Sequence, residues 1–408
     1  MHLPSNHNYQ EMLASPLFVR LTMAEGDNGR EPTLLVKALT LHLKYCVSQE
    51  EIELITISLP GGEILYGLQV KDDPEKPATL WSVLETEEER EALKRTANQE
   101  NLKVFLFNEA CVNPAWSEFK IKSRNDWALE KTETTKLKKI DYDQITPTAT
   151  DYINKFLEGH TDQPDGVWCT AQALSPWMPI SAHYITNQLY SSTLHLFPES
   201  NQCEGDQQEQ LAVWLTDSLS SGGVYKAPIA EEESKPRELC DILINYEHSP
   251  ILIESKCSSA LFENNLPSRE KLTKRTTKAI KNRAIRQLKG GINNIRRGVD
   301  ITDQSGEKIS INKRSPAHLI VLIPDLSLLE GQKEFGGKLL KEVTRESGAL
   351  FQILDPTALL RLMQGANMIH EQSADENITP LVAFDYLLSE RFKAATERED
   401  ANFDVLIR

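Results

Sequence analysis

Two acidic residues and a lysine are spaced in a way that suits chemistry on phosphate esters. Asp241 lies in the apolar run 239–244, and Glu254 and Lys256 close the apolar run 251–256. If the two runs are strands joined by a symmetric turn at 245–250, Asp241 lies opposite Glu254 with β-carbons about 5 Å apart. Residues two apart on a strand share a face, so Lys256 joins the two carboxylates on one side of the sheet.

Such a cluster is unfavourable unless something compensates its charge. Like charges directly opposed on a strand pair destabilise a sheet, and strand interiors select against Asp and Glu. A hard cation such as Mg²⁺ removes the conflict, because it takes one or two carboxylates together with carbonyls, waters and substrate phosphate oxygens. The alternative is an ordinary ion pair between Lys256 and the two acids on a solvent-facing strand. The tripeptide Glu-x-Lys is common by chance, so the neighbouring elements must decide between the two.

The elements around the two strands predict an α/β layer. An amphipathic helix is expected over 207–219, with Glu209 at its start, and it precedes the strands. A long helix is expected over 270–289, interrupted by Gly290-Gly291 and resuming toward Arg297. A buried strand at 318–323, a helix at 333–345, a strand at 350–354 and a helix opened by Pro356 follow. This order predicts a mixed sheet flanked by helices.

The helix after the strands carries most of the positive charge of an acidic chain. The 408 residues hold 45 Lys and Arg against 60 Asp and Glu, a net charge of −15, but residues 269–298 have eleven bases and a single acid, Glu270. Its apolar residues should pack on the sheet, and a separate lysine stripe should contact phosphates. The alternative is that this stripe is merely a solvated face. The apolar set is Ile280, Ala284, Leu288 and Ile292, and the lysine stripe is Lys271, Lys274, Lys278 and Lys281.

This arrangement resembles the PD-(D/E)XK nuclease superfamily, which has the restriction-endonuclease-like fold. The resemblance covers roughly residues 205–365 and rests on Asp241, on Glu254-Ser255-Lys256 and on the helices before and after them. It implies that Asp241, Glu254 and Lys256 are catalytic. It also implies that both carboxylates and the Ser255 carbonyl bind Mg²⁺, for which Mn²⁺ should substitute.

The same resemblance assigns residues on the two helices. Glu209 would be a further metal ligand, although an acid at a helix start also simply favours the helix dipole. The basic helix would lie near DNA, with Gln287 as a contact. The sequence departs from the superfamily in two places: Cys240 stands where many members have Pro, and Gly291 rather than Tyr follows Gln287 by four residues.

The chain is expected to have two domains. Residues 1–200 read as an α+β region that includes a β-hairpin around 60–62 and a helix at 87–98, while 131–150 resembles a connecting stretch or an exposed element. This region has a net charge of −11. It is expected either to regulate or direct the neighbouring domain as a regulatory partner, or simply to bury a face of that domain or build a homo-oligomer. Residues 201–408 form the nuclease-like domain.

The expected function is therefore that of a Mg²⁺-dependent DNA endonuclease, with bacterial anti-phage or plasmid defence suggested by analogy. The alternatives are a non-catalytic module that binds nucleic acid or assembles a complex, and an RNase. Six dispersed cysteines form no CxxC pair, no P-loop motif is present and no apolar run is long enough for a bilayer. The N-terminus has no signal-peptide pattern, so a cytoplasmic protein without a membrane partner is expected.

Overall fold

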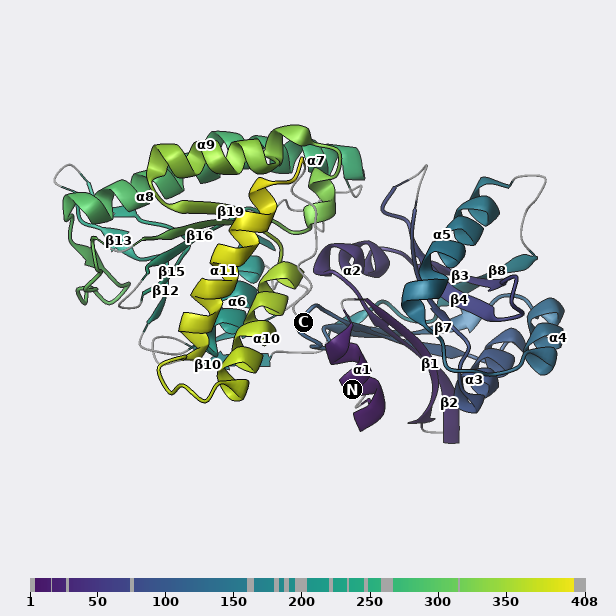
Figure 1. Ribbon diagram of the computed structural model, residues 1–408. Coiled ribbons are helices and arrows are strands. Elements are labelled where there is room, and N and C mark those ends of the chain that lie inside the picture. The colour runs from purple at the N-terminus through teal and green to yellow at the C-terminus, as the bar shows by residue number, and fades with distance from the viewer. Residues whose placement is uncertain are drawn as a thin grey trace. The chain divides into compact units, whose positions relative to one another are not determined.

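The computed structural model shows a mixed α/β protein made of two compact units, Met1–Ser181 and Ala182–Arg408 (Figure 1). The division falls earlier in the chain than the boundary expected at residue 200. The structure describes residues 4–15, 17–26, 29–73, 77–159, 165–179, 183–186, 191–194, 204–219, 223–232, 235–245, 249–257, 267–314 and 316–399.

The first unit is built on a nine-stranded sheet in the order β1-β2-β6-β7-β8-β3-β4-β5, with β9 paired to β7. The expected hairpin is confirmed as β3 and β4, which pair antiparallel across a turn where Gly62 has φ of +83°. The strands are β1 (Phe18–Gly26), β2 (Gly29–Lys37), β3 (Glu51–Ser58), β4 (Ile64–Val70), β5 (Ala78–Val83), β6 (Leu102–Phe107), β7 (Ala115–Ile121), β8 (Gly166–Ala173) and β9 (Met178–Pro179).

The helices of this unit include one that the sequence did not predict. The expected helix at 87–98 is α3, where Thr86 and Glu89 form a capping box. For the second half of 131–150 the connecting stretch is wrong, because α5 begins at Tyr142 and contains Pro147, and the other reading, an exposed element, agrees with the exposure of most residues over 142–150. Thr and Pro disfavour helix, but burial of the α5 apolar face overrides that preference. The helices are α1 (Asn6–Ala14), α2 (Thr40–Val47), α3 (Glu87–Ala97), α4 (Asp126–Thr134) and α5 (Tyr142–Glu158).

The second unit contains the five-stranded mixed sheet β12-β15-β16-β18-β19. The strands β15 and β16 form the predicted hairpin in the predicted register, with Ile244 opposite Ile251 and Ile242 opposite Ile253. The turn residues 246–248 lie outside the described residues. Strands β18 and β19 continue the sheet in parallel with β16. The strands are β12 (Val224–Lys226), β15 (Ile242–Ile244), β16 (Ile251–Ser255), β18 (His318–Leu322) and β19 (Leu350–Leu354).

The strand expected over 239–244 is shorter than the sequence predicted. Its first residues turn away from the sheet, and β14 (Arg237–Glu238) joins β13 (Ile229–Ala230) and β17 (Ile301–Thr302) in a separate small sheet. Asp241 therefore lies at a bend just before β15 rather than inside a strand. Two further strands, β10 (His183–Thr186) and β11 (Ser191–Leu194), pair antiparallel.

Helices cover both faces of the five-stranded sheet (Figure 1). On one face lie α7 (Arg269–Ala279), α8 (Ile285–Arg297) and α9 (Gly337–Ser347), and on the other α6 (Glu204–Asp217), α10 (Pro356–Gln372) and α11 (Pro380–Thr396). The helix predicted at 333–345 begins as a short 3₁₀ turn, η3 (Lys333–Phe335), and another, η2 (Leu326–Leu329), follows β18.

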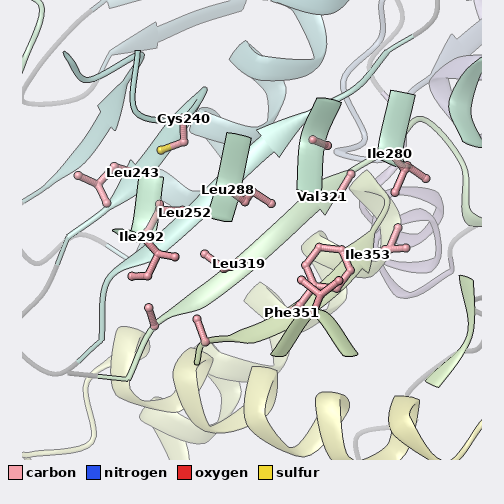
Figure 2. Close-up of a cluster of buried hydrophobic side chains, with 14 of the residues drawn as sticks. Cys240, Leu243, Leu252, Ile280, Leu288, Ile292, Leu319, Val321, Phe351 and Ile353 are labelled. Atoms are coloured by element: carbon pink, nitrogen blue, oxygen red, sulfur yellow. The ribbon is translucent and has the colours of Figure 1, made fainter. Parts of the chain in front are cut away.

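The basic helix is continuous, so the expected interruption at Gly290-Gly291 is wrong. A π-helical turn, η1 (Ile280–Ala284), joins α7 to α8 instead. The predicted packing stripe is confirmed, because Ile280, Ala284, Leu288 and Ile292 are at most 2% exposed. Figure 2 shows Leu288 and Ile292 beside Leu243 and Leu252 of the hairpin in the buried cluster under this face.

Gly291 explains how α8 approaches the hairpin so closely. A β-carbon at this position would lie 2.8 Å from the Leu239 carbonyl oxygen and 3.1 Å from Leu252 Cδ2. Any larger residue would push the helix away from the strands that carry the acidic residues. Glycine is therefore required here for packing, and its low helix propensity is outweighed by burial of the helix face.

Candidate active site

Three oxygen atoms converge on the ammonium group of Lys256 at the end of β16. Lys256 Nζ lies 2.5 Å from Glu254 Oε1, 3.0 Å from the Ser255 carbonyl oxygen and 3.7 Å from Asp241 Oδ2. The structure thus brings Asp241, Glu254, Ser255 and Lys256 into one cluster, as the strand register predicted. These three oxygens surround the positively charged ammonium group of Lys256.

Backbone hydrogen bonds fix Asp241 between its two neighbouring strands. Asp241 Oδ2 accepts a hydrogen bond from the Ser255 amide at 2.6 Å, and the Asp241 carbonyl accepts one from the Ala227 amide at 2.8 Å. The Asp241 carboxylate therefore accepts the hydrogen bond that a backbone carbonyl would accept in a regular strand pair, at a position before β15 begins. This tie holds Asp241 beside the last residues of β16 without a regular strand.

Glu254 is a buried carboxylate that Lys256 only partly compensates. Its side chain is 0% exposed, and within the described residues its Oε2 atom is buried and has no hydrogen-bond partner. Burial raises the pKa of Glu254 to about 7, repulsion from Asp241 adds to the rise, and Lys256 opposes it. A buried acceptor without a partner is costly in a protein interior, so this oxygen is available for a further ligand.

Glu209 lies on α6 and forms a weaker link to the cluster. Its Oε2 atom lies 3.8 Å from Lys226 Nζ on the edge strand β12. Burial raises the pKa of Glu209 to about 7, and repulsion from Asp241 is the next cause. Glu209 is therefore within electrostatic range of Asp241, but its ion pair is with Lys226 rather than with Lys256.

The structure adds Glu238, which the sequence analysis did not select. The residue as a whole is exposed, but desolvation of its carboxyl group beside the cluster raises the pKa of Glu238 to about 7, and hydrogen bonding to Asp241 and repulsion from Asp241 and Glu254 add to the rise. Glu238 is the last residue of β14 and reaches the cluster because the chain bends between β14 and β15. The only signal in the sequence is a second acid three residues before Asp241.

Gln208 is a second residue that the sequence analysis missed. Its Nε2 atom donates to Ser255 Oγ at 2.8 Å and to the Leu322 carbonyl at 3.0 Å. The Lys256 amide also donates to the Leu322 carbonyl, at 2.8 Å. Through these bonds β18 holds the peptide group between Ser255 and Lys256, whose carbonyl oxygen contacts the ammonium group, and α6 holds the Ser255 side chain.

The donor set fits a hard divalent cation. Asp241 and Glu254 supply carboxylate oxygens, Ser255 supplies a carbonyl oxygen, and Glu254 Oε2 is a buried acceptor without a partner. Mg²⁺ is commonly bound by one or two carboxylates with other oxygens completing the octahedron. Among the described residues, no three His, Cys, Asp or Glu side chains form a ready-made metal cluster. The candidate site is thus a two-carboxylate site.

The predicted lysine stripe lies on the exposed side of α7 and η1, and two of its members are already paired. Lys274 forms an ion pair with Glu270 at 2.5 Å, which is within its own helix, and Lys281 forms one with Glu334 at 3.2 Å. Lys271 and Lys278 are exposed as well. The stripe is therefore accessible, but acids of the same unit neutralise part of its charge.

Gln287 is exposed on α8. It lies one turn before Gly291, and residues four apart in a helix share a face. Because Gly291 contacts Leu239, two residues before Asp241, this side of α8 overlies the bend that carries the carboxylate. The position of Gln287 is compatible with the predicted contact to nucleic acid, and nothing fixes its amide within the described residues.

In comparisons with protein-family models, with curated proteins and with solved structures, nothing matches this chain. Within the described residues, no helix has the length and apolar character needed to cross a membrane.

Proposed function

We propose that this protein is a Mg²⁺-dependent DNA endonuclease whose catalytic residues are Asp241, Glu254 and Lys256. The observation that carries the proposal is the convergence of Asp241 Oδ2, Glu254 Oε1 and the Ser255 carbonyl on one cationic position, beside a buried oxygen of Glu254 without a partner. We further propose that the second unit has the restriction-endonuclease-like fold. Its antiparallel hairpin followed by parallel strands, with acids at the hairpin, supports that proposal.

The charge balance of the cluster favours a cation site over a simple ion pair. Glu209, Glu238, Asp241 and Glu254 interact with one another, yet Lys226 and Lys256 are the bases that contact them in the described structure. The pKa values of Glu209, Glu238 and Glu254 are each raised to about 7, and such clusters of shifted carboxyl groups are typical of functional sites. A bound divalent cation would restore the balance.

In the proposed reaction, water adds to the phosphorus atom, the bond from phosphorus to the leaving sugar oxygen breaks, and that oxygen takes up a proton. When bound, Mg²⁺ would supply Lewis-acid neutralisation of the charge that builds on the phosphate. Asp241, Glu254 and the Ser255 carbonyl would hold this metal ion in place. Lys256, already within contact of Glu254, stabilises the developing negative charge on the phosphate and orients the attacking water. Gln208 holds the Ser255 hydroxyl and the Leu322 carbonyl beside the site.

The wider assignments belong to the same proposal. DNA as substrate, Mn²⁺ as a substitute metal, and a role in anti-phage or plasmid defence in the cytoplasm rest on the resemblance to the nuclease superfamily. A homo-oligomer and a regulatory action of the first unit remain predictions. The second candidate function is a non-catalytic module that binds nucleic acid. The basic face of α7 and α8 favours this second function, because that face could bind nucleic acid without any contribution from the carboxylates.

Incubation of the purified protein with supercoiled plasmid, linear duplex, single-stranded DNA and RNA, at varied Mg²⁺ and Mn²⁺, tests the proposal. The wild type should nick or cut DNA with either metal and be inactive in EDTA, while Asp241→Asn and Glu254→Gln should bind DNA but not cut it. Lys289→Ala, on the basic helix but away from the carboxylates, is the matched control and should keep its activity. Cutting in excess EDTA would contradict the metal site. Binding without cutting by the wild type would support the non-catalytic module, and cutting of RNA alone would support an RNase.

A further inference from the structure

An exposed glycine lies inside α8 without a structural reason for being there. Gly290 is in the middle of Ile285–Arg297, and a β-carbon at this position would meet no described atom within 4 Å. Its φ is not in the left-handed region, unlike that of Gly298 at the helix end. Because glycine is the poorest helix former after proline, the fold alone would be served better by almost any other residue. The neighbouring Gly291, in contrast, is required for packing.

Gly290 belongs to a row of residues along the solvent-facing side of α8. Arg286, Gly290, Asn293 and Arg297 follow one another at intervals of four, three and four, so they lie on one face. The row spans about 16 Å at the rise of an α-helix. All four residues are exposed, and within the described part of the chain the three side chains make no hydrogen bond or ion pair.

Three other bases of η1 and α8 are used within the second unit. Lys289 pairs with Glu346 at 2.5 Å, Arg296 donates to the Gly348 carbonyl at 2.8 Å, and Lys281 pairs with Glu334 at 3.2 Å. Residues 271–299 contain no acid at all. In a chain with a net charge of −15, the row on α8 contains no acid and carries two arginines that have no described partner.

We propose that the face formed by Arg286, Gly290, Asn293 and Arg297 binds the phosphodiester backbone of double-stranded DNA, which approaches α8 most closely at Gly290. This inference rests on the proposed function for its choice of DNA. Glycine lets a ligand approach the helix backbone, and the planar guanidinium of arginine matches the geometry of a phosphate. The Asn293 amide can donate to a phosphate oxygen between the two arginines. A rigid duplex presents regularly spaced phosphates, which suit a straight row of donors.

The proposed surface differs from the lysine stripe that the sequence predicted. It places the principal contact on α8 rather than on α7, because the lysines at 274 and 281 already have acidic partners. The α8 row lies on the same helix as Gly291, which packs against Leu239 and Leu252 of the hairpin, but on the exposed side of that helix. A duplex bound there would therefore be held by the helix whose buried side packs on the hairpin that carries Asp241 and Glu254.

Binding of a labelled DNA duplex to the full-length protein in EDTA, followed by fluorescence anisotropy over a range of salt, tests this inference without cleavage. Three variants are compared with the wild type: Gly290→Ala, the double variant Arg286→Ala with Arg297→Ala, and the control Lys338→Ala with Lys341→Ala. The control removes the same charge from exposed positions of α9. Melting curves are recorded for each variant.

Gly290→Ala should raise the melting temperature, because alanine favours the helix, and yet weaken DNA binding several-fold. The double arginine variant should weaken binding and reduce the slope of log affinity against log salt by about one unit for each lost contact, while the control does not. Unchanged affinity in Gly290→Ala, or equal slopes in the arginine and lysine variants, would overturn the inference. Equal affinity for an RNA duplex or an acidic peptide would overturn the choice of DNA. A wild type that shows this binding pattern but never cuts would contradict the nuclease proposal alone.

Discussion

Replacing Glu254 by Gln should make the metal-free protein more stable at and above neutral pH. The pKa of Glu254 is raised from 4.5 to about 7, chiefly by burial. The folded state therefore binds this proton more tightly than the unfolded state does. The stabilising contribution of the protonated group is complete below pH 4.5 and is lost as the pH rises to 7. Above pH 7 the ionised carboxylate costs about 3 kcal/mol, which the amide does not.

The assay is thermal and denaturant unfolding of both proteins between pH 4 and pH 8, without metal and with excess Mg²⁺. Without metal, Glu254→Gln should melt roughly 5–10 °C above the wild type at pH 8 and close to it at pH 4. With Mg²⁺ the wild type should gain stability, because a ligand that binds only the folded state stabilises it, and the variant should gain little. Glu346→Gln is the control, since Glu346 forms an exposed ion pair with Lys289 and should change little.

The result that refutes this reasoning is a less stable Glu254→Gln protein at pH 8 in the absence of metal. It would mean that the ion pair between Glu254 and Lys256 stabilises the fold by itself, as the alternative drawn from the sequence proposes. An equal response of both proteins to Mg²⁺ would refute the role of Glu254 as a metal ligand, whatever the metal-free stabilities are.

Three further predictions follow from other parts of the structure. Lys256→Ala should abolish cleavage and lower the melting temperature without metal, because it removes the ammonium between two carboxylates, and Mg²⁺ should restore part of the lost stability. Gly291→Ala should destabilise the second unit by about 1–3 kcal/mol in denaturant unfolding, since its β-carbon would lie 2.8 Å from the Leu239 carbonyl oxygen. A fragment of residues 182–408 should cut plasmid faster or less selectively than the full chain if the first unit restrains the second. A folded fragment with the same rate and selectivity would exclude that restraint.

The hairpin with its register could be predicted because its information is local. Apolar runs on both sides of a short turn define β15 and β16, and a symmetric turn leaves one register that keeps Ile242, Ile244, Ile251 and Ile253 on one face. The same argument placed Asp241 next to Glu254 and Lys256. The stripe from Ile280 to Ile292 was equally readable, since a helix buries residues at fixed intervals.

Other features could not be read from the sequence, because they depend on contacts between distant segments. A glycine pair normally signals a break in a helix, but Gly291 packs against Leu239 and the helix continues through both glycines. Thr and Pro in α5 disfavour helix, and burial of Ala149, Ile153 and Phe156 against the first sheet decides otherwise. Glu238 reaches the cluster from the bend before β15, and Gln208 reaches it from α6. No spacing in the sequence predicts either contact.

The sequence by itself determined which side chains are available and which neighbours on one hairpin share a face. It determined that Asp241, Glu254 and Lys256 meet, since strand pairing has a period of two and leaves little choice. The tertiary structure alone decided that Glu254 is fully buried with one oxygen unpaired, that Gln208 orients Ser255, and that Gly291 brings α8 onto the hairpin. The physical reason is that burial, and the pKa values that follow from it, depend on every element packed around a group, whereas strand register depends on the hairpin alone.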